Sequence, residues 1–163
     1  PLIRNLVLVD TIAFRQPIPL FFRLLEVPVA RDIGMTLVPP EVQAAQGLRL
    51  AYFDRGKISA RAVAEYANTL YSPAAKHALA ATVAHIVPPN IDEIAARYVT
   101  LRQPTLILWC AEDRVVPLKL GQLLHNTMRS EFVVFSDCGH MPQEERPEDT
   151  SRTILAFLAR NGS

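Results

Sequence analysis

The chain has 163 residues, of which 50% are hydrophobic and 20% are charged, and its formal net charge is +1. These values predict a folded chain of one domain and exclude both intrinsic disorder and the strong positive field of a nucleic-acid-binding protein. The most apolar stretch, residues 18–38, contains charged side chains such as Arg23 and Arg31, so we expect no membrane span there. The chain begins at Pro1 without a signal-peptide pattern, as if it started within a longer protein.

The first predicted element is a strand over residues 5–9, which begins at Asn5 and ends at Val9. Its uninterrupted apolar run is typical of a strand that is buried on both faces. Residues 14–98 then show helical spacing interrupted by prolines. Helix starts in this segment are predicted at Pro39-Pro40 (helix through Phe53), at Ser59, at Ser72-Pro73 and at Asn90-x-x-Glu93 (helix to Tyr98). An insertion of about 85 residues is too long for an ordinary connection between two strands.

From residue 99 onward the pattern alternates between strands and helices. An apolar run over residues 106–110 leads into Ala-Glu-Asp113, and a second run over residues 132–135 leads into Ser-Asp-Cys-Gly-His140. Helices are predicted to begin at Pro117, between the two runs, and at Pro147, after the second. The carboxyl ends of parallel strands meet at one edge of a sheet, where open α/β sheets place their active sites.

Asp113 and His140 are 27 residues apart, which is enough for one helix and one adjacent strand. We therefore predict that their side chains form a hydrogen-bonded pair. A histidine that acts as a general base needs a partner that holds its other ring nitrogen and stabilises its positive charge, and Asp113 can do both. The alternative is that Asp113 caps the helix or the turn at Pro117 and that the backbone satisfies His140.

These residues resemble the C-terminal half of α/β-hydrolase-fold enzymes. The family's acid loop is similar to Glu112-Asp113-x-x-x-Pro117, its histidine loop to Gly139-His140-x-Pro142-x-x-Glu145-x-Pro147, and its sixth strand to Arg4-Asn-Leu-Val-Leu-Val-Asp10. The resemblance implies the α/β fold class with the last three strands of a parallel sheet. It places the hydrolase core in residues 1–13 and 99–163, and a helical cap that roofs the substrate pocket in residues 14–98. A small separate helical domain is the alternative for the insertion.

The nucleophile of this family lies on a G-x-S-x-G elbow. No two of the six glycines are four positions apart, so the chain contains no elbow of this form. The resemblance thus implies a hydrolase fragment that contributes the acid and the histidine of a triad for hydrolysis of an ester or a similar small substrate. We expect the fragment to be inactive alone. Serine, aspartate and cysteine remain open as the nucleophile, and the alternative is a non-catalytic relative that binds a small ligand or assembles with other chains.

Several other residues are weaker candidates. Val116 and Met141 are the candidate lining of a pocket for a small apolar or ester-like substrate. Asp10 is interpreted as a residue that stabilises the turn into the insertion, although some relatives place the triad acid there. Asp137 is interpreted as a turn former, and Glu144-Glu145-Arg146 as a solvated turn whose acids favour the following helix start.

The histidines and tyrosines of the predicted helices are interpreted as packing or solvent-exposed residues rather than as metal ligands or catalytic groups. His77, His85 and His125 lack the mutual spacing of metal ligands, so we expect no metal, and no motif indicates a cofactor. Tyr66 and Tyr71 invite comparison with the cap tyrosines that activate the epoxide in epoxide hydrolases. We interpret both as packing residues.

The two cysteines, Cys110 and Cys138, do not form a disulfide framework. Both are predicted near strand ends, where a bridge between them is the alternative, but we expect two reduced, buried thiols and a cytoplasmic setting.

The expected partners follow from the missing strands. In the family the sheet continues beyond the sixth strand, so the strand from Asn5 to Val9 should have an unpaired edge that lacks charge or proline. We expect this edge to pair with the N-terminal half of a hydrolase or with a second copy of the chain. Neither nucleic acid nor a membrane is an expected partner.

Overall fold

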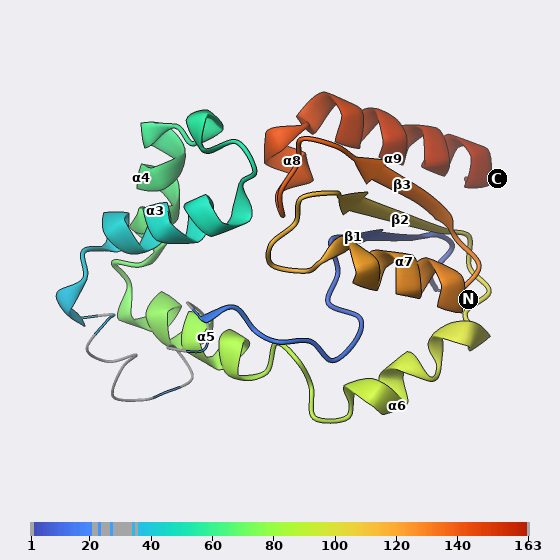
Figure 1. Cartoon of the computed structure of the whole chain (residues 1–163), viewed down its shortest axis with the longest axis horizontal. Coiled ribbons are helices and arrows are strands. Elements are labelled where there is room, and N and C mark those ends of the chain that lie inside the picture. The colour runs from blue at the N-terminus through green and yellow to red at the C-terminus, as the bar shows by residue number, and fades with distance from the viewer. Residues whose placement is uncertain (1, 21–22, 24–26, 28–33, 35, 163) are drawn as a thin grey trace.

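The computed structural model describes residues 2–20, 23, 27, 34 and 36–162, so part of the apolar stretch of residues 18–38 lies outside it. Figure 1 shows a small twisted sheet flanked by helices and, beside it, the helices of the insertion. Within the described ranges no helix is long and apolar enough to cross a membrane.

Three strands form one parallel sheet in the order β1 (Leu6–Val9), β2 (Thr105–Cys110) and β3 (Glu131–Phe135). The predicted parallel sheet is therefore confirmed. All six residues of β2 are buried, because this strand has a neighbour on each side. The expectation that β1 is buried on both faces is wrong: it is half-buried along its length. Among the described residues β1 pairs with β2 only, and its edge position leaves it partly open.

Helices account for most of the remaining chain. The insertion of residues 14–98 contains α3 (Pro40–Ala51), the 3₁₀ turn η1 (Arg55–Lys57), α4 (Ala60–Thr69), α5 (Pro73–Ala84) and α6 (Ile91–Ala95), and the 3₁₀ turn η2 (Tyr98–Thr100) begins at its last residue. The later helices are α7 (Leu118–Thr127), α8 (Pro142–Glu145) and α9 (Pro147–Asn161). The starts of α3, α5, α7 and α9 lie within one residue of the predicted prolines, and α3 stops two residues earlier than predicted.

The predicted caps are confirmed in two cases out of three. The hydroxyls of Ser59 and Ser72 each accept a hydrogen bond from a backbone N–H three residues later, so they begin α4 and α5. Asn90 makes no side-chain capping bond, and α6 ends at Ala95 rather than at Tyr98. Helix α6 has only five residues, and helices this short are marginally stable by themselves.

Helices α7 and α9 cover opposite faces of the sheet (Figure 1). On the α7 face, Ile107 and Trp109 of β2 pack in one core cluster with Leu124. Helix α7 touches the indole directly, since a Cβ at Gly121 would lie 2.5 Å from the Trp109 ring. The indole N–H also donates to the Val116 carbonyl at 3.0 Å. These contacts fix the carboxyl end of β2 and the loop that follows it.

Candidate active site

Asp113 lies on the loop after β2 with its side chain fully buried. Its Oδ1 accepts hydrogen bonds from the backbone N–H groups of Val115 and Val116, at 2.7 and 2.9 Å. Helix α7 itself has no side-chain cap, so Asp113 does not cap the helix but holds the turn before it, as the alternative also allowed. These two bonds hold the carboxylate at the carboxyl edge of the sheet and leave Oδ2 for another donor.

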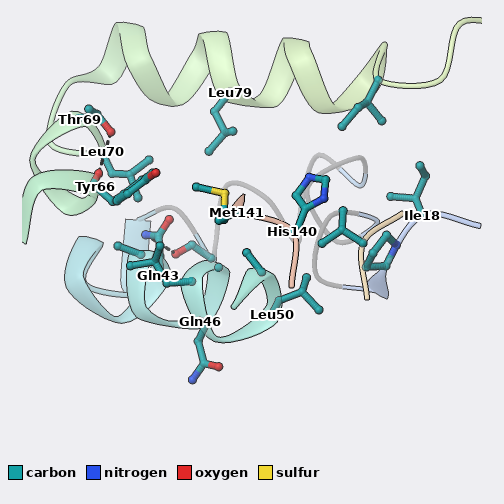
Figure 2. Close-up of a pocket in the computed structure, with 18 of the residues that line it drawn as sticks. Ile18, Gln43, Gln46, Leu50, Tyr66, Thr69, Leu70, Leu79, His140 and Met141 are labelled. Carbon is teal, nitrogen blue, oxygen red and sulfur yellow. Dashed lines mark hydrogen bonds between the residues drawn. The ribbon is translucent and has the colours of Figure 1, made fainter. Parts of the chain in front are cut away.

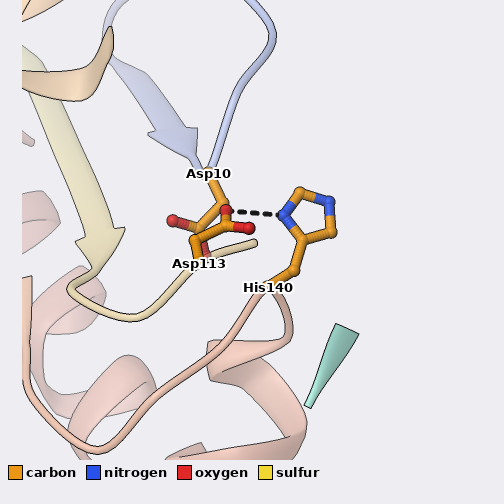
Figure 3. A group of neighbouring side chains, drawn as sticks. All are labelled: Asp10, Asp113 and His140. Atoms are coloured by element: carbon orange, nitrogen blue, oxygen red, sulfur yellow. Dashed lines mark hydrogen bonds and ion pairs between the residues drawn. The ribbon is translucent and has the colours of Figure 1, made fainter. Parts of the chain in front are cut away.

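That donor is His140, on the loop after β3 (Figure 3). Its Nδ1 lies 2.8 Å from Asp113 Oδ2, so the predicted pair is confirmed. Because Nδ1 donates to Asp113, Nε2 is the nitrogen that can take up a proton. The backbone also holds this residue, since the His140 N–H donates to the Ala51 carbonyl at the end of α3, at 2.6 Å.

The surroundings of His140 make its ring a better base. Burial alone lowers the pKa of His140, but the hydrogen bond and the negative charge of Asp113, with a smaller effect from Asp10, more than compensate. The pKa of His140 is therefore raised above its ordinary value. A histidine with a raised proton affinity that is still 28% exposed can receive a proton from a neighbouring molecule.

Asp10 is the third ionisable side chain at this edge, and it comes from the end of β1. It is 4% exposed, and its φ of 41° places it in the left-handed region that asparagine and aspartate tolerate best. Its Oδ1 accepts the Cys110 N–H at 2.9 Å. Asp10 is expected to stabilise the turn into the insertion, but its side chain binds the neighbouring strand. Burial raises the pKa of Asp10 to about 7, although the Cys110 N–H lowers it.

Ligand atoms of Asp10, Asp113 and His140 lie within 4.8 Å of one another. This spacing alone would suit a cation, and the described residues contain one such cluster. We assign no metal to it, because Asp113 and His140 are already hydrogen-bonded to each other. The other three histidines, His77, His85 and His125, do not take part in a metal-compatible cluster anywhere in the described part of the chain.

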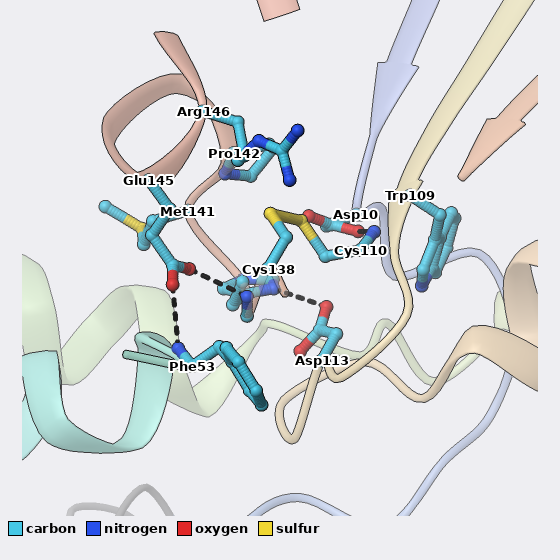
Figure 4. Close-up of a disulfide and its surroundings, with 12 residues drawn as sticks. Asp10, Phe53, Trp109, Cys110, Asp113, Cys138, Met141, Pro142, Glu145 and Arg146 are labelled. Carbon is cyan, nitrogen blue, oxygen red and sulfur yellow. Dashed lines mark hydrogen bonds and ion pairs between the residues drawn. A yellow bond between two sulfur atoms is a disulfide. The ribbon is translucent and has the colours of Figure 1, made fainter. Parts of the chain in front are cut away.

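Cys110 and Cys138 form a disulfide with their Cα atoms 5.0 Å apart (Figure 4). The expectation of two reduced thiols is therefore wrong. In the parallel register Cys110 pairs with Phe135 at the end of β3, which brings Cys138, 28 residues after Cys110 in the sequence, next to Cys110. The bond ties the loop of Asp113 to the loop of His140. The predicted cytoplasmic setting rested on reduced thiols, so it loses that support and stays a prediction.

Glu145 connects the histidine loop to the insertion. It is 3% exposed, and its carboxylate accepts the N–H groups of Gly139 and Phe53, each at 2.8 Å (Figure 4). Gly139 precedes the catalytic candidate His140, and Phe53 follows α3. The interpretation of Glu144-Glu145-Arg146 as a solvated turn is wrong at its central residue. Asp137 has a φ of 52° and is exposed, so it is the turn former that we predicted.

Two tyrosines of the insertion also contact α8. Tyr52 and Tyr66 both donate to the Glu144 carboxylate, Tyr66 at 2.5 Å. Burial raises the pKa of Tyr66 to about 12, and the hydrogen bond to Glu144 adds to this effect. The packing interpretation is wrong for Tyr71, which is 62% exposed and donates to Glu41. Tyr66 lines a cavity rather than the core.

That cavity has a volume of about 640 Å³ and lies between the insertion and His140 (Figure 2). Met141 lines it, as predicted, but Val116 does not. Val116 is fully buried, and its neighbour Val115 lines the cavity instead. No Asp, Glu, Lys or Arg is among the described lining residues. Aliphatic side chains form most of the wall, among them Ile18, Leu50, Leu70 and Leu79.

The contacts of Asp10, Glu145 and Tyr52 are not predicted from the sequence. The available signal for Asp10 was its place at a strand end, the same position from which Asp113 is delivered. For Glu145 the signal was its fixed distance from His140 within the motif. Tyr52 offered no signal, because its contact with α8 depends on how the insertion folds back on the core.

A family model described as the alpha/beta hydrolase family matches residues 1–153. The chain belongs to the alpha/beta hydrolase family. The resemblance seen in the acid and histidine loops and the expected fold class are thereby confirmed, and the coarse function that goes with the family is that of a hydrolase.

Curated relatives match roughly half of the chain. A 2-hydroxy-6-oxononadienedioate/2-hydroxy-6-oxononatrienedioate hydrolase from a Pseudomonas species is 40% identical over 81 residues, which are 49% of this chain and 25% of that protein. The hydrolase of the same description from Escherichia coli (strain K12 / DH10B) is 36% identical over 74 residues, 45% of this chain and 26% of that protein.

Solved structures match nearly the whole chain. An alpha/beta hydrolase fold protein from Burkholderia ambifaria has a TM-score of 0.77 at 23% identity and covers 94% of this chain and 56% of its own. A meta-cleavage product hydrolase from Pseudomonas fluorescens IP01 has a TM-score of 0.74 at 20% identity, and the match covers 96% of this chain and 56% of that protein. The chain therefore spans about half the length of its solved relatives, and at these identities the likeness establishes the fold.

Proposed function

We propose that this chain supplies the acid and the base of a hydrolytic triad, in which Asp113 orients His140 and His140 activates a nucleophile. The observation that carries the proposal is the 2.8 Å hydrogen bond between Asp113 Oδ2 and His140 Nδ1 at the wall of an apolar cavity. An aspartate in this place fixes the imidazole in one tautomer and stabilises the imidazolium that forms. Membership of the family supports the same assignment.

The nucleophile belongs to a segment other than these 163 residues, since they contain no elbow. With a serine nucleophile, the hydroxyl oxygen attacks the ester carbonyl carbon while its proton passes to His140 Nε2. The carbon–oxygen bond to the alcohol then breaks, and the leaving oxygen takes that proton. Water repeats the sequence on the acyl intermediate: it gives its proton to His140, the acid leaves, and the proton returns to the serine oxygen.

The insertion acts as the cap of this site and selects the substrate. Its helices form most of the cavity wall, and His140 and Met141 form the part that faces the chemistry (Figure 2). Burial of a carboxylate without a partner costs several kcal/mol. Since the described lining holds no cationic side chain, we propose a substrate whose cap-facing group is uncharged and apolar.

This substrate differs from those in the names of the curated relatives. Those hydrolases act, by name, on 2-hydroxy-6-oxononadienedioate, which carries two carboxylates. We propose that the present chain shares the hydrolytic pair with them and takes an ester, or a similar acyl compound, with an aliphatic acyl or alkyl group.

A second function is a binding module that keeps the cavity without catalysis. The observation in its favour is that the cavity exists in a chain that has no elbow. In this case an apolar molecule would occupy the cavity against His140 and leave unchanged.

Esterase assays distinguish the two functions. The isolated chain should hydrolyse p-nitrophenyl butyrate no faster than its His140→Ala variant, and a serine-directed fluorophosphonate should leave it unlabelled. When an N-terminal hydrolase segment with an elbow is joined to the chain or added in trans, turnover should appear. Asp113→Asn should then lower kcat about 10⁴-fold. Turnover by the isolated chain that His140→Ala abolishes would contradict the proposal, and apolar-ligand binding without turnover in the joined protein would support the binding module.

A further inference from the structure

Two carboxyl groups lie side by side under His140, and their hydrogen bonds are unequal. Asp113 accepts three hydrogen bonds, two from backbone N–H groups and one from His140. Asp10 accepts one, from Cys110, and its Oδ2 is buried without a partner among the described residues. The two side chains come from different strand ends and are within 4.8 Å of each other and of the His140 ring (Figure 3).

This asymmetry decides which carboxyl group keeps a proton. Hydrogen bonds to a carboxylate favour its charged form, and burial without them disfavours it. Two carboxyl groups in one buried site also resist being ionised together. Glu145 on α8 is negative and acts in the same direction, whereas the Cys110 N–H and, among the described ionisable side chains, His140 favour a negative charge on Asp10.

We propose that Asp10 is a positioning residue for His140: in the resting site, before a nucleophile gives up its proton, the two side chains share one proton, so that Asp10 is neutral while the ring is neutral and ionised while the ring is an imidazolium. Asp10, Asp113 and His140 then titrate as one unit rather than as three separate groups. The pKa of Asp10, raised by burial to about 7, agrees with this assignment.

The inference rests on the proposed function in one respect, namely that the His140 ring must be neutral when it takes the proton of the nucleophile. In the form in which Asp10 holds the shared proton, Nε2 is free to take the nucleophile's proton, and the Asp10 proton stays in place during that step. In the same form the protonated Asp10 spares the buried site a second negative charge. The substrate does not reach Asp10, which is not among the described residues that line the cavity.

The test is a pH titration of the isolated chain by NMR, with labelled histidine rings and aspartate carboxyl carbons. In the wild type the His140 signal should titrate in two steps or over a widened pH range, and one buried aspartate carboxyl should titrate near neutral pH. In Asp10→Asn the His140 curve should become a single step with its midpoint at lower pH. Asparagine keeps an oxygen for the Cys110 N–H and tolerates the left-handed φ of Asp10.

Asp137→Asn is the matched control, because Asp137 also has a left-handed φ and is exposed. It should leave the His140 curve of the wild type unchanged. An identical His140 curve in Asp10→Asn, or an Asp10 carboxyl that titrates together with the exposed aspartates, would overturn the proposal. The wild-type carboxyl signal decides the question even if Asp10→Asn does not fold. The titration needs neither nucleophile nor substrate, so its outcome is independent of whether the joined protein hydrolyses esters.

Discussion

At the scale of single residues, the two buried aspartates of this site differ in how many hydrogen bonds their carboxyl groups accept. Asp113 accepts three hydrogen bonds, whereas Asp10 accepts one. The same contrast has a consequence for stability, because a group whose pKa differs between the folded and the unfolded chain makes the free energy of unfolding depend on pH.

For Asp10 the dependence has a definite sign. Its pKa is raised from 3.8 to about 7 in the folded chain, so its contribution to stability is fully present below about pH 4 and is lost as the pH rises to about 7. Asparagine does not ionise, so Asp10→Asn should lack this pH-dependent loss of stability. Between pH 4 and pH 8 the free energy of unfolding of the wild type should therefore fall relative to that of Asp10→Asn, by about 4 kcal/mol at most. Urea unfolding of both proteins across this pH range would measure the difference. If the free energies of unfolding of the two proteins changed with pH by the same amount, the prediction would be contradicted.

At the scale of elements, the histidine loop and the end of α3 behave as one piece. The His140 N–H binds the Ala51 carbonyl, and Glu145 binds the N–H groups of Gly139 and Phe53. A Cβ at Gly139 would lie 2.1 Å from the Ala51 oxygen and 2.6 Å from the Phe53 nitrogen. Glycine is therefore required at this position for the loop to reach the insertion.

Gly139→Ala should force the loop and α3 apart. We expect it to lower the free energy of unfolding by about 1–3 kcal/mol and to speed hydrogen exchange at the His140 amide. Gly47→Ala is the control: Gly47 lies inside α3 with open space around it, so the added methyl should be neutral or should stabilise by about 0.5–1 kcal/mol. A Gly139→Ala variant as stable as the control would show that the loop and α3 are not in firm contact.

The elements differ in how far the sequence predicts them. The helix starts at Ser59 and Ser72 are local, since serine caps its own turn, and the apolar run of β2 reflects burial on both faces. The pair of Asp113 and His140 follows from strand order. The disulfide, the Glu145 bonds and the place of Asp10 depend instead on register and on how the insertion folds back, which periodicity does not encode.

At the scale of the whole molecule, the sheet is open on the β1 side. The N–H of Leu6 donates to Pro104, just before β2, and that of Asp10 donates to Leu108 of β2. Alternation along the strand therefore directs the N–H groups of Val7 and Val9 toward the unpaired edge. Large apolar side chains are also exposed on the helices that flank the sheet, among them Leu123, Leu155 and Leu158. An edge and apolar surface of this kind favour association with another chain.

We therefore predict that the purified chain associates through β1 when no N-terminal hydrolase segment is present. Light scattering should give a mass above the monomer mass of 18.2 kDa. Val7→Pro should return the chain to a monomer, because proline removes an N–H that β2 does not use. Leu8→Pro is the control that should unfold the sheet, since by the same alternation the N–H of Leu8 points toward β2. A wild-type monomer in which the Val7 amide exchanges rapidly would contradict the prediction.

The hydrogen bond between His140 and Ala51 also constrains how a ligand can enter. If the insertion moved as a rigid body and α3 left the core, the hydrogen bond between the His140 N–H and the Ala51 carbonyl would break, and the main chain of His140 would shift. The end of α3 should therefore stay in place when a ligand enters. Helix α5, which carries Leu79 on the opposite wall of the cavity, has no such tie to the histidine loop among the described contacts, so entry by movement of α5 leaves the base in place (Figure 2).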